Sequence, residues 1–290
     1  MEFIKHGEKN IRIVAPAEIE DAVARLFTDA NYTLTKDVTD CISCALEKER
    51  VPIAKKVLSR ILDNVDAAKE ISVPVCQDTG MAVVFAYVGD RVFVDGNIEE
   101  AINKGVRRAY VDGALRLSVV RDPLYDRVNT NDNTPAIIHI RIVKGENIRI
   151  VALPKGFGSE NMSALKMFTP SATEEDVINF VTDTVVKAGS NPCPPIVVGV
   201  GIGGDFEQCA ILAKECFCRP IDDENPSEKY AALEKKLLEK INLLNIGPQG
   251  FSGDTTALAV KVSAAPTHIA GLPVAVNINC HVIRHAETTI

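Results

Sequence analysis

The sequence predicts a mixed α+β fold in which an N-terminal helical layer packs on mixed or antiparallel sheets. Helix-period apolar residues fill the chain from about residue 16 to 70, and β-rich runs follow them. Tight turns join these runs, and further helical patterns separate them, which favours a mixed sheet over a wholly parallel one. No repeat, low-complexity tract or linker divides the 290 residues. We therefore expect one compact unit over residues 1–290, with residues 1–70 as its helical layer.

Three amphipathic patterns make up the predicted layer. Apolar residues recur at helical spacing from Glu18 to Leu26 and again from Lys36 to Leu46. Pro52 can open a third helix, because proline is tolerated in the first helical turn. Its apolar positions continue to Val65.

The next region predicts two β-hairpins. Gly80–Val88 is a run of small, β-branched and aromatic residues, and Gly89-Asp90 is a turn signal before Val92–Val94. Ala136–Val143 and Ile148–Leu153 form a similar pair around a Lys-Gly-Glu-Asn turn.

The remaining elements follow the same periodicities, and Arg219–Ser227 is the most loop-like segment between them. They are a helix over Ile98–Leu115, a helix with Ser171 and Glu174 at capping-box spacing that ends near Gly189, a strand over Ile196–Val200, a helix over Asp205–Glu215, a helix opened by Asn225-Pro226 and closed by Gly247, and a strand over Val274–Cys280.

Composition excludes some classes of function. The net charge of −7 disfavours nonspecific nucleic-acid binding, which needs clustered Lys and Arg. No apolar run is long enough to span a membrane, and the polar N-terminus does not look like a signal peptide, so we expect a cytoplasmic protein. Eight cysteines in such a chain do not suggest a disulfide framework.

Three cysteines lie in loop contexts suited to binding a metal. Cys76 precedes the first β-rich run, Cys193 lies among prolines, and Cys280 ends a strand. Thiolate ligands need a rigid backbone and nearby donors, which all three contexts offer. A lone cysteine is more often a small buried residue, and spacing alone cannot bring these three together.

The other cysteines fit packing roles better. Cys41 and Cys44 have redox or metal spacing, but they fall within a helical pattern without a second pair. Cys209, Cys216 and Cys218 lie in or just after a predicted helix.

Two glycine-rich segments are candidate binding loops. In the first, Lys155–Asn161, Ser159 can cap a following helix whose N–H groups would suit an anion; a plain capped turn is the alternative. The second, Gly199-x-Gly201-x-x-Gly204, has the form of a dinucleotide fingerprint, with Asp222 at the expected distance. No apolar strand ends at Asp222, so the NAD-dependent oxidoreductase interpretation is the weaker one.

Several charged side chains could contact an acidic substrate. Arg116, Lys155 and Lys166, the last expected in the helix after the first loop, could hold a carboxylate, and arginine can do so with two hydrogen bonds. His281 and His285 could serve near Cys280 as donors or acid–base groups. For each of these residues, a solvated surface charge or a structural histidine is the alternative.

Six motifs in order make the chain resemble the alpha subunit of class I fumarate hydratases and the closely similar L-tartrate dehydratase alpha subunit. The resemblance runs from Cys76 to the C-terminus, and the N-terminal helices fit it with less specific residues. The motifs are CQDTG (76–80), ALRLSVVRDPL (114–124), KGFGSEN (155–161), NPCPP (191–195), GVGIGG (199–204) and NCHVIRHA (279–286).

The resemblance implies the fold of the class I fumarase N-terminal domain and a 4Fe–4S cluster held by Cys76, Cys193 and Cys280. One iron without a protein ligand would act as a Lewis acid on the substrate. The implied catalytic residues are Gln77, Asp78 and Arg116. The implied substrate-binding residues are Gln77, Asp78, Arg116, Lys155, Gly156, Gly158 and Ser159.

The implied reaction is the reversible hydration of fumarate to (S)-malate, with L-tartrate dehydration as the alternative. The threonine-containing motif of fused family members is absent from these 290 residues. We therefore expect a separate beta subunit to supply the general base, in an α2β2 assembly. A non-catalytic iron–sulfur or thiol-rich binding protein is a further alternative.

Overall fold

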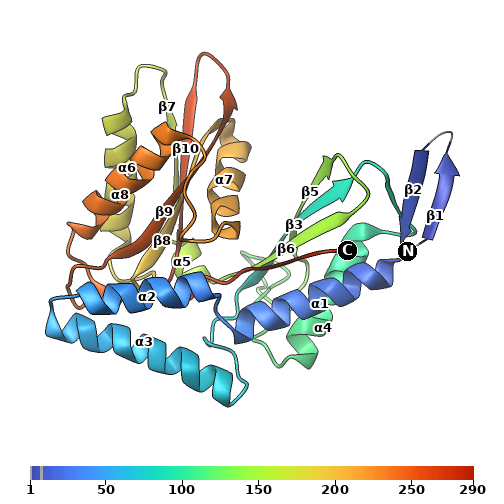
Figure 1. The fold of residues 1–290 in the computed structure, drawn as a ribbon, viewed down its shortest axis with the longest axis horizontal. Coiled ribbons are helices and arrows are strands. Elements are labelled where there is room, and N and C mark those ends of the chain that lie inside the picture. The colour runs from blue at the N-terminus through green and yellow to red at the C-terminus, as the bar shows by residue number, and fades with distance from the viewer. Residues whose placement is uncertain (1, 7–8) are drawn as a thin grey trace. The chain divides into compact units, whose positions relative to one another are not determined.

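A computed structural model describes residues 2–6 and 9–290 (Figure 1). The described residues group into two compact units. Unit 1 comprises the described residues of Met1–Thr33 with Ser72–Lys155 and Arg284–Ile290, and unit 2 comprises Leu34–Ile71 and Gly156–Ile283. Each unit has its own sheet and apolar core. Of the helices predicted within residues 16–70, the first contributes to the core of unit 1 and the other two belong to unit 2.

Unit 1 is a four-stranded sheet with two helices on one face. The sheet order is β11-β6-β3-β5, and α1 packs against both α4 and β6. Alternate residues such as Val84, Ala86 and Ile150 face the helices and are fully or almost fully buried. The elements are α1 (Pro16–Tyr32), β3 (Met81–Gly89), α4 (Ile98–Asp112), β5 (Ile137–Val143), β6 (Ile148–Lys155) and β11 (Ala286–Thr289).

A small second sheet, of order β1-β2-β4, completes unit 1. It consists of β1 (Glu2–His6), β2 (Lys9–Val14) and β4 (Val92–Val94). The first two strands were not expected from the sequence, which assigned residues 1–70 to a helical layer.

The strands of both predicted hairpins are present, but the two strands of each hairpin do not pair with each other. β4 pairs with β2 rather than with β3, and β3 lies between β5 and β6, parallel to the first and antiparallel to the second. Inserting β3 buries its run of apolar residues on both sides, which a terminal hairpin strand would leave at an edge.

Unit 2 is a four-stranded mixed sheet of order β7-β10-β8-β9, with helices on both faces. α6 and α8 cover one face and enclose the main core, while α7 packs on the other (Figure 1). Two further helices, α2 and α3, pack against each other. The elements are α2 (Lys36–Lys48), α3 (Pro52–Glu70), α5 (Phe157–Glu160), β7 (Ala164–Phe168), α6 (Glu174–Ala188), β8 (Ile196–Gly204), α7 (Phe206–Glu215), η1 (Cys216–Cys218), α8 (Glu228–Asn242), η2 (Pro248–Gly250), β9 (Ala257–Thr267) and β10 (Leu272–Asn279).

The glycine-rich segment 199–204 belongs to strand β8 and is not a loop. A Cβ atom on Gly199 would lie 2.1 Å from the carbonyl oxygen of Ala213, and one on Gly201 would lie 1.9 Å from that of Cys209. These glycines therefore let α7 approach the sheet closely. The first N–H groups of α7 are taken by the side chain of Asp205, whose negative charge opposes a phosphate there.

Local caps differ slightly from the predicted ones. α6 begins with a capping box made by Thr173 and Asp176, two residues after the pair suggested by spacing. α8 begins after Ser227 and ends at Asn242, before Gly247. The loop-like segment 219–227 is held by a network in which Arg219 and the buried Lys261 both bind Asp223.

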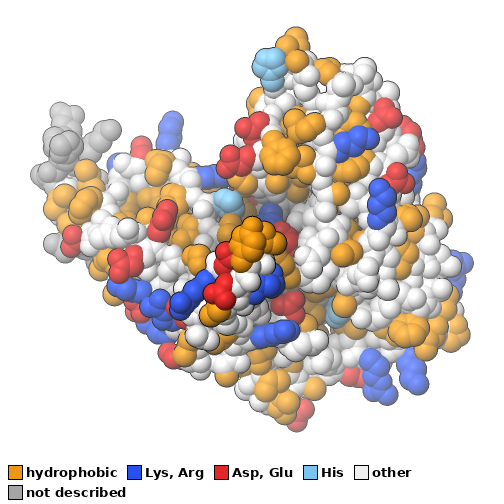
Figure 2. Space-filling view, turned by 180° about the vertical axis from the view of Figure 1, so that it is seen from behind, with side chains coloured by type: hydrophobic (Ala, Val, Ile, Leu, Met, Phe, Trp, Pro, Cys, Tyr) orange, Lys and Arg blue, Asp and Glu red, His pale blue; other side chains and the backbone are white. Residues whose placement is uncertain are grey.

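Acidic and basic side chains are intermixed on the surface in Figure 2. Several form exposed ion pairs, such as Arg60–Asp63 and Lys235–Glu224, which contribute little to stability. Among the described residues, none of the helices combines the length and apolar character needed to cross a bilayer.

Candidate active site

The loop that carries Cys76 leads into β3 and is held by buried side chains of unit 1. The hydroxyl of Tyr110 shares its one hydrogen between the carbonyl oxygens of Thr79 at 2.8 Å and Gly80 at 3.0 Å, and the amide of Asn133 donates to Gly80 at 3.2 Å. Gly80 has φ of +78°, and a Cβ there would lie 2.7 Å from the backbone nitrogen of Lys155. Only glycine fits this position without strain.

Two further contacts fix the residues around Asp78. Thr79 Oγ1 accepts from the backbone N–H of Arg116 at 2.9 Å, which ties the segment carrying Arg116 to the Cys76 loop. Arg284 donates to the carbonyl oxygen of Asp78 at 2.8 Å. Gln77 and Arg116 are exposed, and Asp78 is half-buried. Unit 1 thus places an arginine and a carboxylate on adjoining loops, an arrangement able to orient a polar ligand.

The glycine segment after β6 differs from its predicted form. Lys155, the last residue of β6, is only 1% exposed. Ser159 lies inside the four-residue helix α5, where it donates to the Gly156 carbonyl oxygen at 3.2 Å instead of capping a longer helix. The chain then enters strand β7, so Lys166 lies on a strand and not on the expected helix.

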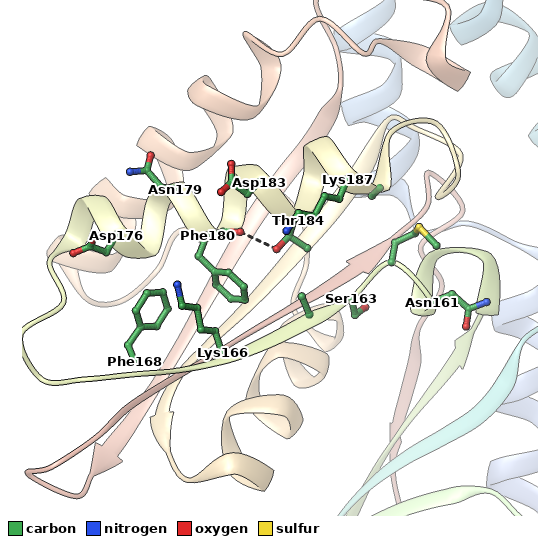
Figure 3. Close-up of a pocket in the computed structure, with 13 residues that line it drawn as sticks. Asn161, Ser163, Lys166, Phe168, Asp176, Asn179, Phe180, Asp183, Thr184 and Lys187 are labelled. Atoms are coloured by element: carbon green, nitrogen blue, oxygen red, sulfur yellow. Dashed lines mark hydrogen bonds between the residues drawn. The ribbon is translucent and has the colours of Figure 1, made fainter.

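Lys166 lines a pocket of about 510 Å³ between β7 and α6 (Figure 3). Its ammonium lies 4.4 Å from the centre of the Phe168 ring and faces Phe180 on the other side of the pocket. This cation–π contact accounts for the position of Lys166 without a substrate.

Unit 2 brings together the segments that carry Cys193 and Cys280. His281 Nδ1 lies 2.9 Å from the carbonyl oxygen of Cys193. The side chain of Gln249 donates to the carbonyl oxygen of Pro194 at 2.7 Å and lies 3.3 Å from the same histidine nitrogen. Cys193 is exposed and Cys280 is half-buried. Two of the three predicted metal ligands therefore lie on directly contacting segments.

Asn279, which sequence reasoning missed, has an unused donor beside Cys280. It is 1% exposed, and its Oδ1 accepts from the backbone N–H of Cys280 at 3.1 Å. Its Nδ2 has no hydrogen-bond partner among the described residues. A buried donor without a partner is costly unless a bound group accepts from it. The adjacency of Asn279 and Cys280 in the sequence was the available signal.

The predicted site residues divide between the units. Within either unit, the described residues contain no group of three or more His, Cys, Asp or Glu side chains placed to hold a metal ion. Unit 1 carries Cys76, Gln77, Asp78, Arg116 and Lys155, and unit 2 carries Gly156, Gly158, Ser159, Cys193 and Cys280.

The remaining cysteines are in packed or helical positions. Burial raises the pKa of Cys41 on α2 to about 11, and it raises that of Cys216 to about 11. Both thiols therefore stay protonated at neutral pH, whereas a metal ligand must be a thiolate. Cys209 is buried against the sheet, and Cys44 is exposed on α2.

Fold and site together define an α+β protein whose polar, thiol-bearing loops lie at the ends of strands. The chain belongs to the fumarate hydratase (Fumerase) family, whose family profile matches residues 20–289. Membership of this family makes it a hydro-lyase.

The curated relatives match over almost the whole chain. A Methanocaldococcus jannaschii protein with the provisional name L(+)-tartrate dehydratase subunit alpha is 43% identical over 274 residues, which cover 93% of this chain and 96% of the relative. The L(+)-tartrate dehydratase subunit alpha of Escherichia coli strain K12 is 30% identical over 282 residues, which cover 94% and 92%.

Proposed function

We propose that this chain is the cluster-bearing alpha subunit of a two-subunit hydro-lyase that interconverts (S)-malate and fumarate. The contact between the Cys193 and Cys280 segments, in a chain of the fumarate hydratase family, is the observation that carries the proposal. The names of the relatives favour a second candidate substrate, L-tartrate, which is also a four-carbon dicarboxylate.

The proposed cofactor is a 4Fe–4S cluster held by the thiolates of Cys76, Cys193 and Cys280. The donor set fits such a group, because thiolates are the preferred ligands of iron–sulfur clusters. The unpaired Nδ2 of Asn279 fits it too, since hydrogen bonds to cluster and ligand sulfur atoms stabilise their negative charge. When bound, an iron without a protein ligand supplies Lewis acidity toward the substrate hydroxyl.

The side chains of unit 1 would bind and orient the substrate. The exposed guanidinium of Arg116 can hold a carboxylate with two parallel hydrogen bonds, and Thr79 fixes the backbone that carries it. Gln77 can donate to the same substrate, and Asp78 is fixed beside it through its backbone carbonyl. Lys155 would add positive charge, and unit 2 would contribute Gly156, Gly158 and the buried Ser159.

The general base would come from a beta subunit. The relatives carry the designation subunit alpha, which supports a partner of this kind. We therefore expect the isolated chain to be inactive or nearly so, and activity to appear when the beta subunit is added, in an α2β2 complex.

Substitution of the three thiols tests the cofactor. Cys76→Ser, Cys193→Ser and Cys280→Ser should each abolish the visible absorbance, iron and sulfide of protein reconstituted without oxygen. Cys41→Ser, at a thiol that burial keeps protonated, is the matched control and should retain all three. Absence of iron and sulfide from the reconstituted wild type would refute the proposal.

Turnover by the reconstituted pair tests the substrate. Assays with (S)-malate and L-tartrate in parallel should give the higher kcat/KM for malate if the first candidate is correct. A preference for L-tartrate would select the second candidate, and turnover of neither would refute both.

A further inference from the structure

Gln249 lies in the turn between α8 and β9, bonded to the Cys193 segment and close to His281 of the Cys280 segment. Its backbone N–H and its side-chain Nε2 each donate to the carbonyl oxygen of Pro194 at 2.7 Å. Two donors from one residue thus converge on the carbonyl that follows Cys193. The same Nε2 lies 3.3 Å from His281 Nδ1, next to Cys280 in the chain.

The hydrogen-bond chemistry fixes the orientation of both side chains. The carbonyl oxygen of Cys193 can only accept, so His281 Nδ1 must carry the hydrogen that is donated to it at 2.9 Å. The Pro194 carbonyl also only accepts, so the nitrogen of the Gln249 amide must face it. Gln249 and His281 therefore hold two consecutive carbonyl groups of the Cys193 segment.

The turn that carries Gln249 is itself tightly fixed. Gln249 has φ of 53° and ψ of 19°, in the left-handed region that a residue with a side chain adopts at a cost. A Cβ on Gly247 would lie 2.0 Å from the backbone of Ser252, and one on Gly250 would lie 2.5 Å from the Cβ of Ser190. The strained backbone directs the Gln249 side chain at the Cys193 segment from a turn with little freedom to move.

We propose that Gln249 is a positioning residue that holds the Cys193 segment where His281 can bind it, so that the Cys193 and Cys280 thiols are prearranged before any metal binds. The inference rests on the proposed function for its purpose, because prearranged thiolates bind a cluster at a lower cost in conformational entropy. Its physical content is that the Gln249 amide holds the Cys193 segment in place while His281 joins that segment to Cys280, and this arrangement is measurable without a cofactor.

The structure offers substitutions that isolate the side chain. Gln249→Ala removes Nε2 but keeps the backbone N–H bonded to Pro194, and alanine and glutamine bear a similar cost at positive φ. Gln249→Glu keeps the size and removes the donor. The matched control is Gln208→Ala on α7, which deletes an exposed glutamine of the same unit.

The test uses the metal-free full-length chain and a fluorogenic cross-linker that reacts with two neighbouring thiols, with the linked cysteines identified by peptide mapping. Cys193 and Cys280 should be cross-linked in the wild type and in Gln208→Ala. The rate of Cys193–Cys280 cross-linking should fall about fivefold in Gln249→Ala and Gln249→Glu. This factor corresponds to the free energy that one hydrogen bond contributes. Their unfolding temperatures should stay near that of the wild type, because the backbone bond remains.

Three results would overturn the inference: no Cys193–Cys280 link in the wild type, an unchanged rate in both Gln249 variants, or slower linking only in step with a lower unfolding temperature. The last result would indicate a purely structural role. A wild type that forms the link but takes up no iron and sulfide would instead refute the proposed function and leave the positioning role intact.

Discussion

The hydroxyl of Tyr110 donates to the carbonyl oxygen of Thr79 at 2.8 Å and thereby connects helix α4 to the loop that carries Cys76. Tyr110 is fully buried, and this burial raises its pKa far above the usual value for a tyrosine, so the phenol remains a hydrogen-bond donor at any physiological pH. A single buried side chain on the helix thus fixes a loop that begins about thirty residues earlier in the chain.

Tyr110→Phe should lower the free energy of unfolding by about 1–3 kcal/mol, because it leaves a buried carbonyl oxygen without its donor. Denaturant unfolding measures the change, and alkylation of Cys76 should become faster as the loop loosens. Tyr125→Phe is the control, since Tyr125 is 88% exposed. Equal stability of the two variants would contradict the role assigned to Tyr110.

Asn279→Asp should weaken cofactor retention. The substitution keeps an oxygen for the N–H of Cys280 but replaces the unpaired donor with a second acceptor. Loss of one charge-assisted hydrogen bond lowers a binding constant roughly tenfold or more. The visible absorbance of the loaded protein should therefore decay about tenfold faster in air. Asn179→Asp on the exposed side of α6 provides the comparison, and equal decay rates would exclude a donor role for Asn279.

Glu49→Gln should destabilise unit 2. The buried carboxylate of Glu49 accepts from the backbone N–H groups of Arg50, Val51, Asp254 and Thr255 at 3.0–3.3 Å, and so joins the start of α3 to the turn before β9. An amide has one acceptor oxygen instead of two, which leaves buried donors unpaired at a cost of about 1–3 kcal/mol. Thermal unfolding should distinguish this variant from Glu47→Gln, because the side chain of Glu47 is exposed. Identical unfolding temperatures would contradict a stabilising role for Glu49.

Asp223 should make stability depend on pH. Burial acts to raise the pKa of Asp223, but hydrogen bonds and charges from Arg219 and Lys261 outweigh it and lower the pKa. A lowered folded-state pKa means that the carboxylate stabilises the fold above its unfolded pKa of about 4, and that this contribution disappears as the pH falls through the folded-state pKa.

Asp223→Asn should therefore be less stable than the wild type at neutral pH and should lose less stability on acidification. Unfolding curves measured from neutral pH downward, in closely spaced steps around a pH of about 4, reveal both effects. Asp222→Asn, at the exposed neighbouring position, should keep the wild-type profile. If the stability of Asp223→Asn fell with pH in parallel with that of the wild type, the ion pairs of Asp223 would not contribute to the pH dependence of stability.

The sequence alone determined most of the local structure. The helices over residues 16–70, the strands around Val84 and Val198 and the helix that follows Asp205 all come from periodicity and capping, which act between neighbours in the chain. The motifs that indicated the fumarate hydratase family are equally local. Short segments such as β7 and β11 were missed because a few residues at a sheet edge carry little pattern of their own.

Only the tertiary structure decided which segments meet. The insertion of β3 between β5 and β6, the packing of α7 on Gly199 and Gly201, and the contact of Gln249 with the Cys193 segment join residues that are distant in the chain. Such pairings depend on the sum of burial and hydrogen bonding over a whole unit, and no spacing rule encodes them. The sequence could therefore supply the prediction that Cys76, Cys193 and Cys280 are ligands, whereas the hydrogen bonds that join the segments of two of them depend on the fold of unit 2.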